Sequence, residues 1–194
     1  MRSRPGGLWL ALALAVVAFP ASGRADTPAG PEFDPASGYR IARYRAPLPE
    51  TVPGATRIFA ADVPALVKDK RARLIDVMAA EGAGYDAKTG RWRLAKTHDH
   101  IPGSIWLPDV GKGVVDARLD AYFQLSLEQA TDGDKTRSLI IYCQSDCWMS
   151  WNAVKRAASY GYTSIYWLPE GIDGWRDWDW PLVPANPEPV PPIP

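Results

Sequence analysis

Short apolar runs alternate along this chain with segments of helical periodicity, and this alternation restricts the possible fold more than any other feature. Residues 73–77, 138–142 and 164–168 are rich in Leu, Ile and aromatic side chains, as buried strands are. Residues 119–130 and 150–159 instead place apolar side chains at helical spacing. Strands that alternate with helices favour a parallel sheet covered on both faces. We therefore expect a single-domain α/β fold with helices on both faces of the sheet.

Composition divides the chain into four parts. Residues 1–25 have the pattern of a secretory signal peptide, because Arg2 and Arg4 precede a short apolar run and then small residues. An uncleaved membrane anchor is the alternative interpretation. Residues 26–54 form a predicted N-terminal extended arm, with disorder as the alternative. The folded domain covers 55–182. The proline-rich tail, 183–194, is expected to be of polyproline type and to lie outside the core.

The signal peptide and the charge balance restrict location and partners. An exported chain is expected to be periplasmic and soluble after cleavage, in a compartment that permits disulfides. Its 22 basic and 22 acidic residues give a net charge of zero, and Lys and Arg form no cluster. Proteins that bind nucleic acids present a basic patch, so we expect no nucleic-acid partner. The sequence makes no prediction of the oligomeric state.

The chain has two cysteines, Cys143 and Cys147, at the end of a predicted strand and before a predicted helix. In that position Cys143 meets free backbone N–H groups and the positive end of the helix dipole. Both features favour the thiolate, and a helix N-terminus lowers a thiol pKa from about 8.5 by one unit or more. Cys143 is therefore a candidate nucleophile, provided that its sulfur is accessible. The alternative is a small buried apolar side chain.

The second cysteine allows several arrangements. At this spacing on a helix the two Cα atoms lie about 6 Å apart, which is within the disulfide range. A bridge that closes so short a loop stabilises the fold by only about 2 kcal/mol. We therefore favour a reversible dithiol/disulfide pair in which Cys143 attacks and Cys147 resolves. A static disulfide and a pair of metal or cofactor ligands are the alternatives. We expect no metal, because only His98 and His100 are available as further nitrogen ligands.

Four motifs together resemble the rhodanese-like domain over residues 55–182. They are Leu-Ile-Asp-Val at 74–77, His-Ile-Pro-Gly-Ser-Ile at 100–105, Ile-Ile-Tyr-Cys at 140–143 and Leu-Pro-Glu-Gly-Ile-Asp-Gly-Trp at 168–175. The segment 143–148 is also similar to a family of exported rhodanese-like proteins with a Cys…Cys-Trp (CXXCW) motif. That family is associated with alcohol catabolism dependent on pyrroloquinoline quinone (PQQ). Its motif name spells two residues between the cysteines, whereas this chain has three.

The resemblance implies roles for the loop that follows the third motif. Rhodaneses carry a persulfide on the cysteine that corresponds to Cys143, held by loop amides. The corresponding substrate-binding loop here is Gln144, Ser145, Asp146, Trp148 and Met149. Rhodanese loops normally carry a basic residue, but residues 143–154 contain no Lys or Arg, and Asp146 is acidic. Repulsion between like charges therefore disfavours thiosulfate as the donor.

The remaining candidates are interpreted mainly as structural. Trp148 and Trp151 flank the loop, where they can shield sulfur, stack on a flat ligand such as PQQ or dock a partner, but core packing is the preferred interpretation. Asp76 is expected to accept backbone N–H bonds, and His100 to hold its turn. An exposed Trp178–Trp180 pair would indicate a binding edge.

Three functional hypotheses follow. The first is thiol–disulfide or persulfide exchange at Cys143 and Cys147, on a small sulfur or thiol substrate. The resemblance associates this activity with a PQQ-dependent alcohol oxidation system. The second is sulfur transfer by Cys143 alone, with a donor other than thiosulfate. The third is a non-catalytic, disulfide-stapled module that binds a periplasmic dehydrogenase or cytochrome.

Overall fold

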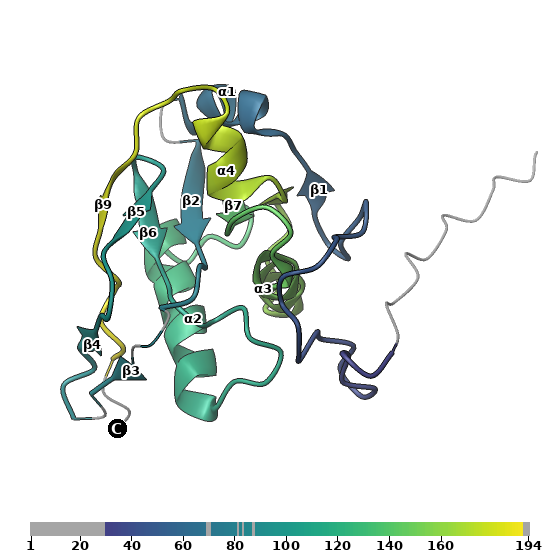
Figure 1. The fold of residues 1–194 in the computed structure, drawn as a ribbon, viewed down its shortest axis with the longest axis vertical. Helices are drawn as coiled ribbons and strands as arrows, with labels where there is room; N and C mark the ends of the chain where they lie inside the picture. The colour runs from purple at the N-terminus through teal and green to yellow at the C-terminus, as the bar shows by residue number, and fades with distance from the viewer. Residues whose placement is uncertain (1–29, 69–70, 81, 83, 87, 192–194) are drawn as a thin grey trace, which may run out of the picture.

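Five parallel strands form the central sheet of the computed structural model, which describes residues 30–68, 71–80, 82, 84–86 and 88–191 (Figure 1). The strand order is β1-β8-β7-β2-β6, and every neighbouring pair is parallel. The strands are β1 (Thr56–Arg57), β2 (Ala72–Asp76), β6 (Ser104–Trp106), β7 (Ser138–Tyr142) and β8 (Ile165–Leu168). The expected single-domain α/β fold with a parallel sheet is therefore confirmed.

The sheet is buried on both faces because successive side chains of a strand point to opposite sides. Ile75, Leu139 and Ile141 point to one face and pack with α2 (Ala117–Thr131) and α3 (Trp148–Ser159). Leu74 and Ile140 point to the other face. That face is covered by the 3-10 helix η1 (Ala60–Asp62), α1 (Val63–Val67) and α4 (Gly171–Arg176). Burial on both faces explains why the strands are continuously apolar in the sequence.

One helix boundary differs from its prediction in a way that affects the cysteine loop. The helix expected at 150–159 begins at Trp148, so Cys147 is its N-cap residue. The expected start was wrong because Trp148 and Met149, which we assigned to the loop, have the helical conformation and are buried. The helix expected at 119–130 is α2, which is capped by Asp116 through a 2.8 Å hydrogen bond from the Leu119 amide.

Two small antiparallel ribbons flank the sheet. One is a hairpin around Gly90, formed by β3 (Gly84–Tyr85) and β4 (Trp92–Arg93). The other joins β5 (His98–His100) to β9 (Val183–Ala185), which belongs to the proline-rich tail. Beyond β9, Val190 is only 1% exposed and lies in the core, and its amide donates to the Gly90 carbonyl over 2.9 Å.

The prediction that the tail lies outside the core is therefore wrong for Ala185 and Val190. Proline lacks an N–H group and is tolerated at the edge of a sheet, where one side of the strand needs no ladder bond. The tail occupies such an edge and supplies Ala185 and Val190 as buried apolar side chains.

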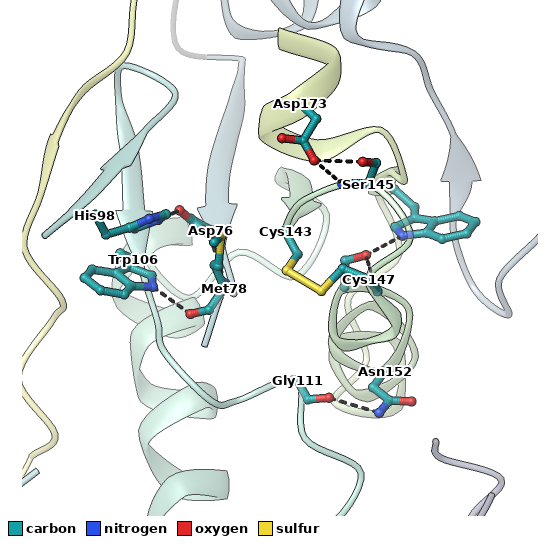
Figure 2. Close-up of a disulfide and its surroundings, with 12 residues drawn as sticks. Asp76, Met78, His98, Trp106, Gly111, Cys143, Ser145, Cys147, Asn152 and Asp173 are labelled. Atoms are coloured by element: carbon teal, nitrogen blue, oxygen red, sulfur yellow. Dashed lines mark hydrogen bonds and ion pairs between the residues drawn. A yellow bond between two sulfur atoms is a disulfide. The ribbon is translucent and has the colours of Figure 1, made fainter. Parts of the chain in front are cut away.

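The N-terminal arm lies along the domain from residue 30 onward. Phe33 and Val52 are buried in the main core cluster. Between them, the Asn152 side chain binds Arg40 by accepting from its amide over 3.0 Å and donating to its carbonyl over 2.8 Å. Asn152 also donates to the Gly111 carbonyl over 2.9 Å (Figure 2).

The predicted signal peptide, residues 1–25, falls outside the described residues. Within the described part of the chain, no helix has both the length and the apolar character needed to cross a bilayer.

We predict that Asn152→Ala destabilises the protein by about 2–3 kcal/mol, because it leaves buried backbone groups of the arm without partners. Urea unfolding measures this change. The control is Gln124→Ala, which removes an exposed hydrogen bond on α2 and should change the free energy of unfolding by less than about 0.5 kcal/mol. Equal effects of the two substitutions would contradict the anchoring role of Asn152.

Candidate functional site

Cys143 and Cys147 form a disulfide at the carboxyl end of the sheet (Figure 2). Cys143 directly follows β7, and Cys147 is the N-cap of α3, so the bridge closes the loop between a buried strand and a helix. Their Cα atoms are 6.2 Å apart, close to the expected distance, although the two cysteines do not share a helix as that expectation assumed. The side chains are 1% and 2% exposed. The interpretation of Cys143 as a nucleophile required an accessible sulfur atom. In this conformation the sulfur atom of Cys143 is buried.

Helix α4 holds one side of the loop. The Ile172 amide donates to the Cys143 carbonyl over 2.9 Å. Gly171 has a φ of +56°, and a Cβ atom there would overlap this carbonyl, so only glycine fits this close approach. Asp173 accepts hydrogen bonds from the Ser145 amide over 3.0 Å and from the Ser145 hydroxyl over 2.7 Å. The loop conformation is thus fixed by α4 through main-chain and side-chain bonds.

The N-terminal arm holds the other side of the loop. Arg45 pairs with Cys147 in an isolated antiparallel bridge. The Ala46 amide donates to the Asp146 carbonyl over 3.0 Å, and the Trp148 amide donates to the Tyr44 carbonyl over 2.8 Å. The arm therefore runs beside the disulfide as a short antiparallel strand and takes part in covering it.

These contacts change the electrostatics expected for the loop. The resemblance implies that loop amides hold the anionic sulfur. In this structure, however, the Ser145 amide donates to Asp173 and the Trp148 amide donates to the Tyr44 carbonyl. Asp173 adds a second acidic side chain beside Asp146, but it also pairs with Arg176 over 3.4 Å. The loop therefore offers an anionic sulfur donor fewer free amides than the resemblance implies.

The family is shown by comparison with known protein families, since the model of the rhodanese-like domain matches residues 59–177. This chain belongs to the rhodanese-like domain family. The matched segment lies within the predicted domain and includes the cysteine loop, α4 and every strand of the central sheet except β1. A comparison with curated proteins finds no match.

A search of solved structures finds similar proteins at low sequence identity. A Bacillus halodurans protein is 22% identical, with a TM-score of 0.44 and coverage of 66% of this chain and 76% of that one. The 3-mercaptopyruvate sulfotransferase SseA from Escherichia coli is 18% identical, with a TM-score of 0.49 and coverages of 73% and 53%. The thiosulfate sulfurtransferase from Pseudomonas aeruginosa is 16% identical, with a TM-score of 0.48 and coverages of 72% and 22%.

The structure places the predicted loop residues of this rhodanese-like domain in different settings. Trp148 is buried against Phe33 and Trp151, and the Arg40 guanidinium lies 4.8 Å from its ring. Its faces are therefore occupied by protein groups, in agreement with core packing. Met149 is also buried and contributes to the core. Gln144 and Ser145 are half-buried, and Asp146 is exposed, with a left-handed φ of +53°.

Sequence reasoning missed one pair of polar residues at the same end of the sheet. The fully buried Asp76 carboxylate ends β2 and binds His98 Nε2 over 2.6 Å. The same carboxylate accepts from the Met78 amide over 2.9 Å, which confirms the expected backbone bond. The His98 ring also packs against Trp106, with 4.4 Å between the centroids. The sequence signal was an acid that ends an apolar run, followed downstream by two histidines, but their pairing depends on β5.

Within the described residues, no group of three or more His, Cys, Asp or Glu side chains could hold a metal ion. His98 pairs with Asp76, and neither cysteine is free.

His100 provides a pH-dependent test of this end of the sheet. Burial lowers its pKa below the ordinary value of 6.5, and the nearby Asp76 opposes this shift only in part. Because the fold favours neutral His100, its contribution to stability is present above pH 6.5 and is lost as the pH falls below that value. We predict that the difference in unfolding free energy between wild type and His100→Gln narrows from pH 7.5 to pH 5.5. Parallel urea titrations measure it, and a constant difference would contradict the prediction.

Proposed function

We propose that this rhodanese-like protein carries out thiol–disulfide exchange through Cys143 and Cys147. The observation that carries the proposal is the disulfide across the loop at which the rhodanese resemblance places the reactive sulfur. A bridge that closes so short a loop contributes only about 2 kcal/mol to stability. The domain already has extensive apolar clusters on both faces of its sheet. Stability alone is therefore a weak reason for the bridge, and reversible chemistry is the better one.

Sulfur transfer through a persulfide on Cys143 has less support. It requires the bridge to be opened first, because both sulfur atoms are already bonded to each other. The loop amides of Ser145 and Trp148 are also occupied by Asp173 and Tyr44. No Lys or Arg lies between residues 143 and 154, so the loop itself offers a small anionic donor only the acidic Asp146. A thiol carries no charge until it loses its proton, so it meets less of this repulsion as it docks.

A disulfide-stapled binding module is the second candidate function, and the burial of both sulfur atoms favours it. The domain also has an aromatic edge after α4. Trp178 is 56% exposed and stacks on Trp180, with ring centroids 5.4 Å apart. Exposed tryptophans are frequent anchors in protein interfaces. In this role the bridge would be permanent.

The cellular setting belongs to the same proposal. A disulfide supports an oxidising compartment, which agrees with the signal-like segment and with a periplasmic location. The resemblance to the Cys…Cys-Trp family supports a place in PQQ-dependent alcohol oxidation, with a periplasmic dehydrogenase or cytochrome as partner. We do not propose that Trp148 stacks on PQQ itself, because protein groups occupy the faces of its ring.

The reduction potential of the pair distinguishes the two candidates. We predict a midpoint above about −300 mV, since exchangeable disulfides lie above this value and structural bridges below it. Equilibration of the full chain in dithiothreitol buffers, followed by acid quenching, alkylation and mass spectrometry, measures it. A midpoint below about −300 mV would support the stapled module and exclude exchange.

A second measurement addresses sulfur transfer. Cys147→Ser leaves Cys143 as a single thiol, and we expect this variant to neither accept nor transfer persulfide sulfur at a measurable rate. Mass spectrometry detects the added sulfur atom. Efficient transfer by the variant would favour a sulfurtransferase that uses Cys143 alone.

A further inference from the structure

The segment of the arm that lies on the cysteine loop has the geometry of a bound peptide. Residues 44–47 make two main-chain hydrogen bonds with the loop, on either side of the Arg45–Cys147 pair. A third bond runs from Trp148 Nε1 to the Pro47 carbonyl over 3.1 Å. These bonds use backbone groups of the arm, so an extended segment of different sequence can make them too. Proteins commonly bind extended peptides by this kind of strand addition.

The segment is less buried than the two anchors that hold the arm on either side of it. Its anchors are Arg40 and Val52, which are buried in the domain. Between them, Arg45 and Pro47 are exposed, whereas Tyr44 and Ala46 are half-buried. Displacing residues 44–47 breaks the three bonds to the loop and the 3.0 Å bond from the Gly113 amide to the Tyr44 hydroxyl. It also uncovers the side chains of Tyr44 and Ala46 that pack on the core, while both anchors stay in place.

The register of the bridge places one position of the docked segment opposite a sulfur atom. The Ala46-to-Asp146 and Trp148-to-Tyr44 bonds flank the Arg45–Cys147 pair, which makes it a non-hydrogen-bonded antiparallel pair. In such pairs the Cα atoms are about 4.5 Å apart. That separation lies within the range of about 4.4–6.8 Å found in disulfides. A cysteine at the Arg45 position of a docked segment can therefore bond to Cys147.

We propose that the cysteine loop docks an extended segment of a partner polypeptide, whose cysteine takes the place of Arg45, and that residues 44–47 occupy this site in the absence of the partner. This inference rests on the proposed thiol–disulfide exchange and names its substrate class as a protein thiol. It also differs from the prediction that Cys143 bonds to the substrate, because the register assigns that role to Cys147.

The exchange needs only the partner's thiol and the Cys143–Cys147 disulfide as reactants. The partner's thiol loses its proton, and its sulfur attacks Sγ of Cys147. The bond between the two sulfur atoms of the bridge breaks, and its electron pair leaves with Cys143, which takes up the proton. The products are a mixed disulfide between the partner and Cys147 and a free thiol at Cys143.

Arg45→Cys in the full chain tests the register directly. We expect the introduced thiol to attack Cys147 and release Cys143, so that non-reducing peptide mapping finds a bridge between positions 45 and 147. The matched control is Pro47→Cys, at a diagonal position where the Cα separation is about 7–8 Å. The control should form its bridge to Cys147 at least about tenfold less. Equal yields, or a bridge to Cys143 instead, would overturn the assignment.

A peptide tests docking in trans. Ala46→Pro removes the N–H that binds the Asp146 carbonyl, and circular dichroism checks that the variant is folded. A synthetic peptide of residues 42–50 with serine at position 45 should bind this variant in calorimetry and bind wild type at least about tenfold more weakly, because the arm competes in wild type. The same peptide with cysteine at position 45 should form a mixed disulfide with Cys147 of the variant.

The outcomes separate this inference from the proposed function. If the serine peptide does not bind while dithiothreitol reduces the pair, docking is wrong and exchange survives. Binding of the peptide to a pair that cannot be reduced would reject the exchange, and with it the protein-thiol substrate, while leaving a peptide-binding loop. Equal reactivity of glutathione and the cysteine peptide would show that a small thiol is sufficient and would contradict the assigned substrate class.

Discussion

Main-chain hydrogen bonding of the loop between β7 and α3 is the constraint on which the rest of the site depends. A buried loop must find partners for its N–H and C=O groups, because leaving them unpaired away from water is unfavourable. Here α4 supplies the Ile172 amide and the Asp173 carboxylate on one side. The arm supplies the Tyr44 carbonyl and the Ala46 amide on the other. The disulfide joins the two ends of the loop that these supports hold.

Because the arm covers the disulfide, any reaction at the two sulfur atoms depends on the arm segment at residues 44–47. In a loop open to solvent, amides at the start of a helix are free to hold an anion. In this chain the Trp148 amide binds the arm, and the Ser145 amide binds Asp173. The site is therefore organised around a protein backbone rather than around a small anion. Reaction at the buried sulfur atoms requires the covering segment to move, whereas the sheet and the helices beneath it can stay as they are.

Elements determined by local periodicity were predicted well from the sequence, whereas contacts between distant residues were not. Strands β2, β7 and β8 and helix α2 were predicted nearly to their ends, because local apolar periodicity determines them. The start of α3 was misplaced because Trp148 is both a helical residue and a partner of the arm. The pairing of Asp76 with His98 was missed because residues 22 positions apart meet only when the chain brings the start of β5 to the carboxyl end of β2.

By itself, the sequence determined the α/β architecture and placed both cysteines at the carboxyl end of a buried strand, because these features follow from local periodicity and from chain order. It also determined the acidic character of the cysteine loop. Only the tertiary structure decided that both sulfur atoms are covered, that the proline-rich tail contributes Val190 to the core, and that Arg45 lies opposite Cys147. The physical reason is that these contacts join segments distant in the chain through backbone hydrogen bonds, which any residue with free main-chain groups can form and which therefore leave no signature in the side chains.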